Sequence, residues 1–345
     1  MVEMSPIHLK PPYLLFVGDE HRPSYAKTAL GIVDWRPDSC AGQLRLSTEA
    51  VDLGLPDLSI DNARARGVQS LLIGTALVGG AIPDVWLDTL IAAARAGLDI
   101  IGGLHQRLED VPALAAAARQ SGARLIDVRT PPEALPVGTG KKRSGKRLLT
   151  VGTDCALGKK YTALQLEKEM RAEGAHVDFR ASGQTGIMIA GQGLPLDAVI
   201  SDFLSGAAEM LSPSADDNHW DVIEGQGAIF HPGYGAVSHG LLIGSQPDAL
   251  VLCHHAGRTH VSGWPDTPLM PIKDVIQRNV DIAALTNPAV RCVGLSVNTA
   301  HLGKIEAEAY LADLSQVHGL PATDPIRFGC ANILQALEVT FGPLA

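Results

Sequence analysis

The sequence predicts an α/β protein made of two parallel-sheet domains, and three observations predict this class. The chain has 345 residues, more than one hydrophobic core usually serves. Short apolar runs of β type alternate with helical segments, which is the pattern of parallel sheets. The alternation stops once, between Thr130 and Lys146, in a stretch rich in Pro, Gly and Lys. We therefore expect a first domain over residues 1–130, a linker over 131–146 and a second domain over 147–345.

The first domain is expected to hold a Rossmann-like sheet. Helices are predicted over 83–96, which ends at Gly97, and over 109–120. No G-x-G-x-x-G motif follows a strand here, so NAD binding is not expected. His105 is the best site candidate of this domain. The strands are predicted at the apolar runs 14–17, 70–73, 99–101 and 124–128.

Composition and charge argue against several classes of partner. A net charge of −9 and an aromatic content of 4% oppose binding to nucleic acid or to an anionic membrane surface. No apolar run approaches the roughly 20 residues that span a bilayer. The five cysteines are scattered without a C-x-x-C pair, which favours a reducing cytoplasm and predicts no zinc site. We expect a cytoplasmic protein with a small-molecule partner, and a homo-oligomer stays open.

The second domain begins with a strand, a glycine loop and a helix. These are predicted over 147–151, 152–158 and 159–173, with Gly174 closing the helix. The basic run 141–143 in the linker is interpreted as solvated. Further strands are predicted at 176–179, 221–223, 249–253 and 290–296.

The loop of this domain has the features of a phosphate-binding site. Where a tight glycine loop leads from a strand into a helix, backbone N–H groups and the helix N-terminus attract phosphate oxygens. Lys159 follows Gly158 directly, as in a P-loop, where the lysine ammonium reaches the bound phosphates. We therefore expect a P-loop NTPase-like domain. The residues predicted to bind a phosphorylated cofactor are Gly152, Thr153, Asp154, Cys155, Ala156, Leu157, Gly158, Lys159 and Lys160.

Two positions of the loop depart from the P-loop consensus. Thr153 stands where the consensus has its first glycine, and Lys160 stands where Ser or Thr would give a hydroxyl to magnesium. Thr162 could still replace that hydroxyl. Because a second cation beside Lys159 suits a bound diphosphate, we expect no metal at this site.

Outside the loop, six short motifs carry a resemblance to known proteins. They are Gly103-Leu104-His105, Ser182-Gly183-Gln184-Thr185-Gly186, Asp202-Phe203, Glu224-Gly225-Gln226-Gly227, His231-Pro232-Gly233-Tyr234 and Asp324-Pro325-Ile326-Arg327-Phe328. Together they resemble the D-glutamate N-acetyltransferase family over most of the chain. The loop and the Glu224 motif alone also resemble dethiobiotin synthetase-like P-loop proteins, over the C-terminal half.

The resemblance implies transfer of an acetyl group from acetyl-CoA to the amine of D-glutamate or a related D-amino acid. Coenzyme A carries a pyrophosphate and a 3′-phosphate, which a P-loop could hold without hydrolysing anything. Two alternatives stay open. One is an ATP- and magnesium-dependent ligase or kinase of the dethiobiotin synthetase type, and the other is a nucleotide-binding regulator without catalysis.

Acetyl transfer to an amine needs a base for the ammonium proton, donors for the carbonyl oxygen and a positioned thioester. Glu224 ends a predicted strand, where open parallel sheets place ligands, and is the preferred base. Asp202 is a second acid, and His231 and the pair 254–255 could shuttle protons near neutral pH. Cys155 offers a covalent route, although direct transfer is favoured. For each of these a structural role is the competing interpretation.

A dicarboxylate substrate also needs cationic and amide partners. Arg180 and Arg258 could form bidentate contacts with its carboxylates. Gln184, Gln226 and Asn298 lie beside predicted turns and could donate hydrogen bonds to the substrate or to the carbonyl oxygen.

Overall fold

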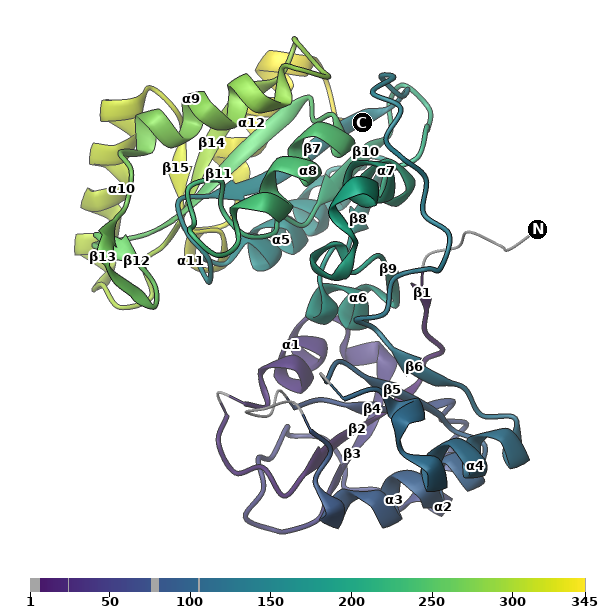
Figure 1. Cartoon of the computed structure of the whole chain (residues 1–345). Coiled ribbons are helices and arrows are strands. Elements are labelled where there is room, and N and C mark those ends of the chain that lie inside the picture. The colour runs from purple at the N-terminus through teal and green to yellow at the C-terminus, as the bar shows by residue number, and fades with distance from the viewer. Residues whose placement is uncertain (1–6, 24, 76–80, 105, 345) are drawn as a thin grey trace. The chain divides into compact units, whose positions relative to one another are not determined.

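The polypeptide forms two compact units, each with its own parallel sheet (Figure 1). The N-terminal unit contains the described residues up to Pro132 together with Gly183–Ala198, and the C-terminal unit contains Glu133–Ser182 and the described residues from Val199 onward. The predicted α/β class with two parallel-sheet domains is confirmed. The structure is a computed structural model that describes residues 7–23, 25–75, 81–104 and 106–344. The candidate site residue His105 therefore lies outside the described residues.

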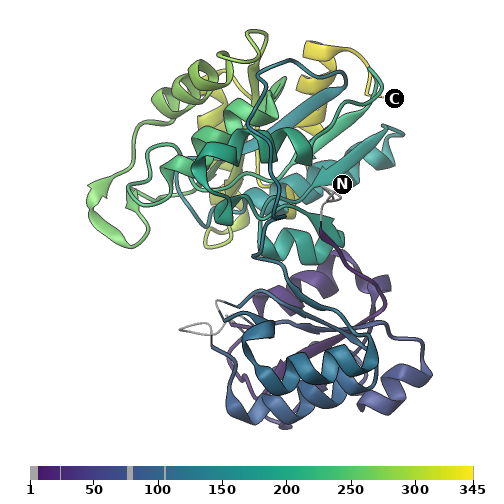
Figure 2. The same cartoon turned by 45° about the vertical axis from the view of Figure 1, so that its right-hand side comes forward.

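The N-terminal unit is built on a five-stranded parallel sheet of order β3-β2-β4-β5-β6. Figure 2 shows helices α3 and α4 side by side against this sheet. The four predicted strands are found nearly where they were expected. The strands are β2 (Tyr13–Gly18), β3 (Cys40–Arg45), β4 (Ser70–Ile73), β5 (Asp99–Gly102) and β6 (Leu125–Asp127). The helices are α1 (Lys27–Trp35), α2 (Ile60–Ala65), α3 (Asp84–Arg95) and α4 (Pro112–Ser121), with 3-10 turns at Pro37–Ser39 and Leu108–Asp110.

Trp86 on α3 lies in the core of this unit. Its ring is fully buried and packs edge-on against Phe16 of β2, with 5.1 Å between the ring centroids. Its Nε1 donates a hydrogen bond to Asp19 Oδ1 at 2.7 Å. Gly18 leaves room for the indole, because a Cβ at that position would lie 2.3 Å from Trp86 Cε2. The buried face of α3 therefore fixes this helix against β2.

We expect the substitution Trp86→Ala to lower the free energy of unfolding by about 3–5 kcal/mol, because it leaves a cavity among buried groups. Urea unfolding followed by circular dichroism measures this, and hydrogen exchange should locate the loss in β2 and α3. Val85→Ala is the control, since Val85 is 65% exposed. Equal losses in the two variants would contradict the role assigned to Trp86.

Two elements of this unit differ from the sequence prediction. Strand β3 was not predicted, because Cys40–Arg45 carries glycine and glutamine in place of an apolar run. It is an edge strand, and Gly42 within it lets Leu58 approach, since a Cβ there would lie 2.6 Å from Leu58 Cδ1. Helix α4 begins at Pro112, because proline suits the first turn of a helix, and the residues before it form a separate 3-10 turn.

A short segment from the middle of the chain packs with the N-terminal unit. Helix α6 (Gln184–Ala190) contacts α1, and Thr185 Oγ1 lies 3.3 Å from Thr28 Oγ1. Strand β9 (Gln192–Gly193) pairs antiparallel with β1 (Ile7–His8), and a 3-10 turn follows. The sequence predicted one boundary between the domains and did not predict this insertion.

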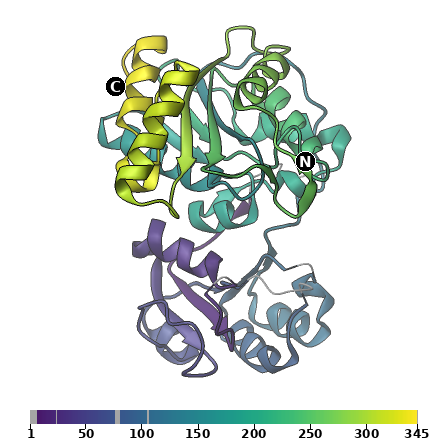
Figure 3. The ribbon, with the colours of Figure 1, turned by 90° about the vertical axis from the view of Figure 1, so that its left-hand side faces the viewer.

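The C-terminal unit is built on a six-stranded parallel sheet of order β15-β14-β11-β7-β10-β8. Figure 3 shows helices on both sides of it. Beside the sheet, β12 (His260–Val261) and β13 (Trp264–Pro268) form an antiparallel hairpin. The strands of the sheet are β7 (Lys146–Gly152), β8 (Val177–Arg180), β10 (Trp220–Ile223), β11 (Ala249–His255), β14 (Arg291–Asn298) and β15 (Ala322–Thr323). The helices are α5 (Lys159–Ala172), α7 (Ser201–Leu211), α8 (Gly235–Ser245), α9 (Ile272–Ala283), α10 (Lys304–His318), α11 (Pro325–Phe328) and α12 (Ala331–Phe341).

The sequence suggested that the basic run before β7 is solvated, but two of its side chains make contacts within the protein. Arg143 is largely buried, and its guanidinium donates to the carbonyl oxygens of Ser212, Gly244 and Ser245. Burial lowers the pKa of Arg143 to about 10. Lys142 reaches Asp248 Oδ2 at 3.0 Å. The end of the predicted linker therefore belongs to the C-terminal unit.

The parallel order brings the carboxyl ends of all six strands to one edge of the sheet, which is where ligands bind in such folds. Strand β7 lies inside the sheet, between β11 and β10, so the loop that follows it has neighbours on both sides. Among the described residues, the helices are too short or too polar to traverse a bilayer.

Candidate phosphate-binding site

The loop between β7 and α5 has the geometry that the sequence predicted. Gly158 has φ +104° and Ala156 has φ +52°, a left-handed conformation that is uncommon outside glycine. Helix α5 begins at Lys159 without a side-chain cap, so its first N–H groups need partners from outside the helix. A phosphate is such a partner.

Lys159 folds back into its own loop. Its Nζ donates a hydrogen bond to the Asp154 carbonyl oxygen at 2.8 Å. The side chain is buried, and this burial lowers the pKa of the ammonium. Gly225 makes room, because a Cβ there would lie 1.7 Å from the Thr150 carbonyl oxygen and 3.1 Å from Lys159 Cδ. A bound phosphate would offer Lys159 a charged acceptor in place of the carbonyl oxygen.

Asp154 ties the loop to the β12–β13 hairpin. Its fully buried carboxylate accepts hydrogen bonds from the backbone N–H of Cys155 at 2.6 Å and of Ser262 at 2.9 Å. Arg258 NH1 donates to the same carboxylate at 2.9 Å and to the Cys155 carbonyl oxygen at 2.8 Å. Asp154 and Arg258, which were predicted to contact cofactor and substrate, are therefore paired with each other. Ser262 belongs to no motif of the sequence, so its contact with Asp154 could not be predicted.

His231 is held as the tautomer with its proton on Nε2. Its Nδ1 accepts hydrogen bonds from the backbone N–H of Gly233 at 3.1 Å and of Tyr234 at 3.2 Å, so that atom acts as the acceptor. The ring lies against Tyr234 and Trp264, with centroid distances of 4.7 and 4.6 Å. Its Nε2 is buried 3.8 Å from Asp154 Oδ1 and lacks a hydrogen-bond partner among the described residues.

This tautomer limits what the neighbouring groups can do. Asp154, Cys155 and His231 offer ligand atoms within 4.8 Å of one another. A metal on His231 Nε2 would require the proton on Nδ1, where it would face two N–H donors. The same constraint opposes the predicted proton shuttling and leaves His231 a hydrogen-bond donor. Burial raises the pKa of Cys155, which disfavours the thiolate that a covalent route needs.

Glu224 follows β10 directly and is buried beside the loop. Its Oε2 accepts a hydrogen bond from the backbone N–H of Ser182 at 3.1 Å, and Ser182 Oγ donates to the Glu224 carbonyl oxygen at 2.5 Å. Gln226 Nε2 donates to the same hydroxyl at 3.0 Å. Glu224 and Gln226, which the sequence nominated separately, therefore share Ser182. Ser182 is the first residue of the motif Ser182-Gly183-Gln184-Thr185-Gly186, but the sequence indicated no role for it.

Arg180 is paired with acids on the sheet, and Asp202 lies at the start of α7. Arg180 Nε donates to Asp221 Oδ1 at 2.7 Å, and its NH2 donates to Asp178 Oδ2 at 3.2 Å. Asp221 lies near the start of β10, so this guanidinium is directed away from the carboxyl edge. Asp202 is exposed in the first turn of α7, a position that favours acids in any helix.

Gln184 belongs to the N-terminal unit, although Ser182 two residues earlier belongs to the C-terminal one. With its amide oriented to satisfy both neighbours, Gln184 donates to the Gly103 carbonyl oxygen at 2.8 Å and accepts from Arg129. One sequence motif is thus divided between the two units. Its glutamine packs in one of them and its serine holds Glu224 in the other.

The Thr162 hydroxyl, the alternative to the missing magnesium hydroxyl, is hydrogen-bonded inside the protein. Its Oγ1 is buried and lies 2.7 Å from Ser296 Oγ, between α5 and β14. Lys160 stands at the usual hydroxyl position, and its Nζ lies 4.6 Å from the centre of the Tyr161 ring. The loop therefore offers cations where a magnesium-dependent P-loop has a hydroxyl.

Thr153, at the place of the first consensus glycine, joins the loop to β11. Its Oγ1 lies 3.0 Å from His254 Nδ1, and both side chains are buried. Burial lowers the pKa of His254 to about 4, with help from the charge of His255. His254 is therefore neutral at pH 7. The neighbouring His255 stacks on His301, with 5.0 Å between the ring centroids.

We expect His254 to make the protein less stable in acid. Its folded pKa of about 4 lies below the unfolded value of 6.5, so its contribution is complete above pH 6.5 and is lost as the pH falls toward 4. Between pH 8 and pH 5 this amounts to about 2 kcal/mol. His254→Asn retains an acceptor near Nδ1 and should lose less stability over that range in urea unfolding. The exposed His239→Asn is the control, and identical pH profiles for wild type and His254→Asn would refute the assignment.

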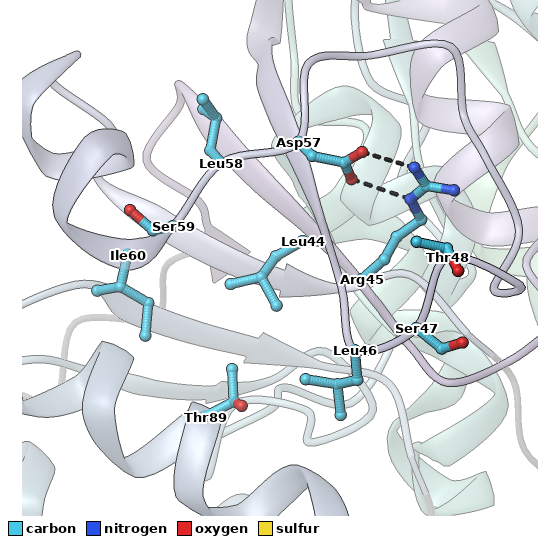
Figure 4. Close-up of a pocket in the computed structure, with 10 residues that line it drawn as sticks. All are labelled: Leu44, Arg45, Leu46, Ser47, Thr48, Asp57, Leu58, Ser59, Ile60 and Thr89. Atoms are coloured by element: carbon cyan, nitrogen blue, oxygen red, sulfur yellow. Dashed lines mark hydrogen bonds and ion pairs between the residues drawn. The ribbon is translucent and has the colours of Figure 1, made fainter.

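A second cavity, of about 600 Å³, lies in the N-terminal unit beside β3 (Figure 4). The two ionisable side chains that line it are paired, since Arg45 Nε donates to Asp57 Oδ1 at 2.9 Å. Its other lining groups are leucine and isoleucine side chains and hydroxyls. Because the charges of Arg45 and Asp57 already neutralise each other, the loop of the C-terminal unit is the better candidate site for an anionic ligand.

The fold and the loop define an α/β protein in which a Rossmann-like domain precedes a P-loop domain. Two family models agree with this class: one described as DUF1611_C P-loop domain, of unknown function, matches residues 136–334, and one described as DUF1611_N Rossmann-like domain matches residues 39–131. The chain belongs to the DUF1611 family. It is also similar to a crystal structure of a DUF1611 family protein from Anabaena variabilis, with a TM-score of 0.82 and 34% identity, covering 96% of this chain and all of that one.

Two curated relatives of this family carry a functional name. A protein from Tritonibacter scottomollicae named D-glutamate N-acetyltransferase is 47% identical over 329 residues, covering 95% of this chain and 99% of the relative. A protein from a Pseudoalteromonas species with the same name is 45% identical over 331 residues, covering 96% of this chain and all of the relative. The family resemblance that the sequence motifs predicted is confirmed.

Proposed function

We propose that this chain transfers the acetyl group of acetyl-CoA to the amine of D-glutamate. The observation that carries the proposal is the pair of relatives named D-glutamate N-acetyltransferase, 45–47% identical over nearly the whole chain. Identity at this level over both domains supports a shared activity as well as a shared fold. The acetyl donor is the one that the family resemblance implies, and the chemistry of the loop supports it.

The loop supports a diphosphate ligand held by lysines. Lys160 occupies the position of the magnesium hydroxyl, and the Thr162 hydroxyl is engaged with Ser296. A diphosphate in the loop would therefore be neutralised by Lys159, Lys160 and the N-terminus of α5. Coenzyme A needs no phosphoryl transfer, so it suits a site that binds a diphosphate without polarising it for attack.

Glu224 is the residue we assign as general base. Its carboxylate lies at the carboxyl end of β10, next to the loop, and is oriented by the Ser182 N–H. In the proposed reaction it removes a proton from the ammonium of D-glutamate, and the free amine attacks the thioester carbonyl carbon. The C–N bond forms as the C–S bond breaks, and the coenzyme leaves as a thiolate that takes the proton held by Glu224. The second proton lost from the amide nitrogen passes to the freed Glu224 carboxylate and then to solvent.

We expect purified protein to release free thiol from acetyl-CoA when D-glutamate is present, and to release much less with L-glutamate. The measurement is a thiol assay supported by mass detection of N-acetylglutamate, run beside ATP with magnesium. ATP consumption without thiol release would overturn the proposal and favour the ligase or kinase alternative. Tight nucleotide binding without turnover would favour the regulator.

We expect Glu224→Gln to lower kcat by about 10²–10⁴-fold, the usual contribution of a general base, with little change in the KM for acetyl-CoA. Cys155→Ala should retain most of the activity, because direct transfer does not use the thiol. The control for the charge change is Glu338→Gln, an exposed glutamate on α12. Loss of activity in Cys155→Ala with an intact fold by circular dichroism would instead indicate an acetyl-enzyme.

A further inference from the structure

A cavity of about 200 Å³ adjoins the phosphate loop within the C-terminal unit. Three elements enclose it: the end of the loop with the first turn of α5, the carboxyl end of β14, and α11. The groups that line it are mainly apolar, and two charged residues join them: the buried Asp324, whose carboxylate accepts hydrogen bonds from Thr299, and the exposed Arg327. Its lining includes Leu157, Tyr161, Asn298, Pro325, Ile326 and Arg327.

The size and position of the cavity suit one part of a larger ligand. Pockets that hold a whole drug-sized molecule measure roughly 300–1,000 Å³, so this one fits a single ring system. Gly158 and Tyr161 belong both to its lining and to the loop–helix junction, so a ring placed here would be continuous with phosphates on the loop. Apolar walls with an amide at Asn298 suit a flat heterocycle that has hydrogen-bonding edges.

The charges around the cavity distinguish between nucleotides. Arg327 is exposed at the rim and directs its NH1 to the carbonyl oxygens of Thr299 and Leu302, at 2.7 and 3.1 Å. A guanidinium has five N–H donors in a fixed fork, so Arg327 retains donors for an anion while these bonds fix its position. Coenzyme A differs from ATP and ADP in carrying an additional phosphate on the 3′ oxygen of the ribose. A cation at the mouth of a nucleoside cavity is the group that this phosphate requires.

Resting on the proposed function, we propose that this cavity binds the adenosine part of acetyl-CoA and that Arg327 binds its 3′-phosphate. The order of the sheet supports this direction of binding. The cavity lies on the β14 side of the loop and Glu224 lies on the β10 side, with β7 and β11 between β10 and β14. A ligand with its nucleoside in the cavity and its diphosphate on the loop directs the pantetheine arm toward Glu224.

The experiment compares ligands that lack successive parts of the coenzyme. Isothermal titration calorimetry gives the Kd of CoA, dephospho-CoA and ATP with magnesium, and thiol release gives the KM of acetyl-CoA and S-acetylpantetheine. Two variants alter the cavity: Arg327→Ala removes the cation, and Ala300→Trp fills the cavity from an exposed lining position. Arg291→Ala is the matched control, because Arg291 is exposed at the opposite end of β14.

We expect Arg327→Ala to weaken CoA binding about tenfold or more, as for the loss of a hydrogen-bonded charge, and to leave the Kd of dephospho-CoA unchanged. Ala300→Trp should weaken both and leave turnover of S-acetylpantetheine intact. Arg291→Ala should match the wild type. Damage to the fold would weaken both coenzymes equally in Arg327→Ala, which separates a structural role of this arginine from phosphate binding.

Two results would overturn the inference. If acetyl-CoA supports acetylation of D-glutamate but the Kd of CoA is unchanged in both cavity variants, the cavity assignment fails and the proposed function stands. If the wild type binds ATP with magnesium and does not bind CoA, both fail together.

Discussion

The buried carboxylate of Asp154 is the interaction on which the site depends. A charge with no exposure to solvent is tolerated only when hydrogen-bonded and paired, and Asp154 meets both conditions. Its partners are Cys155 on the loop itself, Arg258 just before the β12–β13 hairpin and Ser262 in the turn of that hairpin. Removing the carboxylate would leave Arg258 without its acid and would release the loop from the hairpin. The loop is therefore held in shape from the side by contacts within the protein.

This bracing explains how the loop can be formed before a ligand arrives. Lys159 Nζ donates a hydrogen bond to the Asp154 carbonyl oxygen, and Gly225 leaves space for the lysine side chain. Burial disfavours the charged form of this lysine. A diphosphate would relieve that cost, because the ammonium would exchange a neutral acceptor for a charged one. Because folding already orders the loop, a ligand does not have to order it, and less of the binding free energy is used to offset lost conformational entropy.

Local patterns predicted the parts of the structure that are local in the sequence. The strand, glycine loop and helix at 147–173 were predictable because glycine spacing and apolar periodicity act over a few residues. The role of Asp154 was not, because its partners Arg258 and Ser262 lie 104 and 108 residues away. Arg180 ends its strand as predicted, yet only the register of β8 against β10 reveals that Asp221 takes its guanidinium. The motif around Gln184 could not be divided between two units from sequence, because nothing local marks where the chain changes partners.

The tautomer of His231 shows how backbone contacts decide chemistry that residue identity leaves open. A histidine titrates near neutral pH and so suggests a proton carrier, but two backbone N–H groups occupy Nδ1 of His231 and leave Nε2 as a donor. Because His231 is restricted to donating and His254 is kept neutral by burial, we propose a carboxylate as the general base. Glu224 is the carboxylate adjacent to the loop, and Ser182 fixes its direction. In the proposed function, two tasks are therefore separated along the carboxyl edge, with anion binding assigned to the loop after β7 and proton removal to Glu224 after β10.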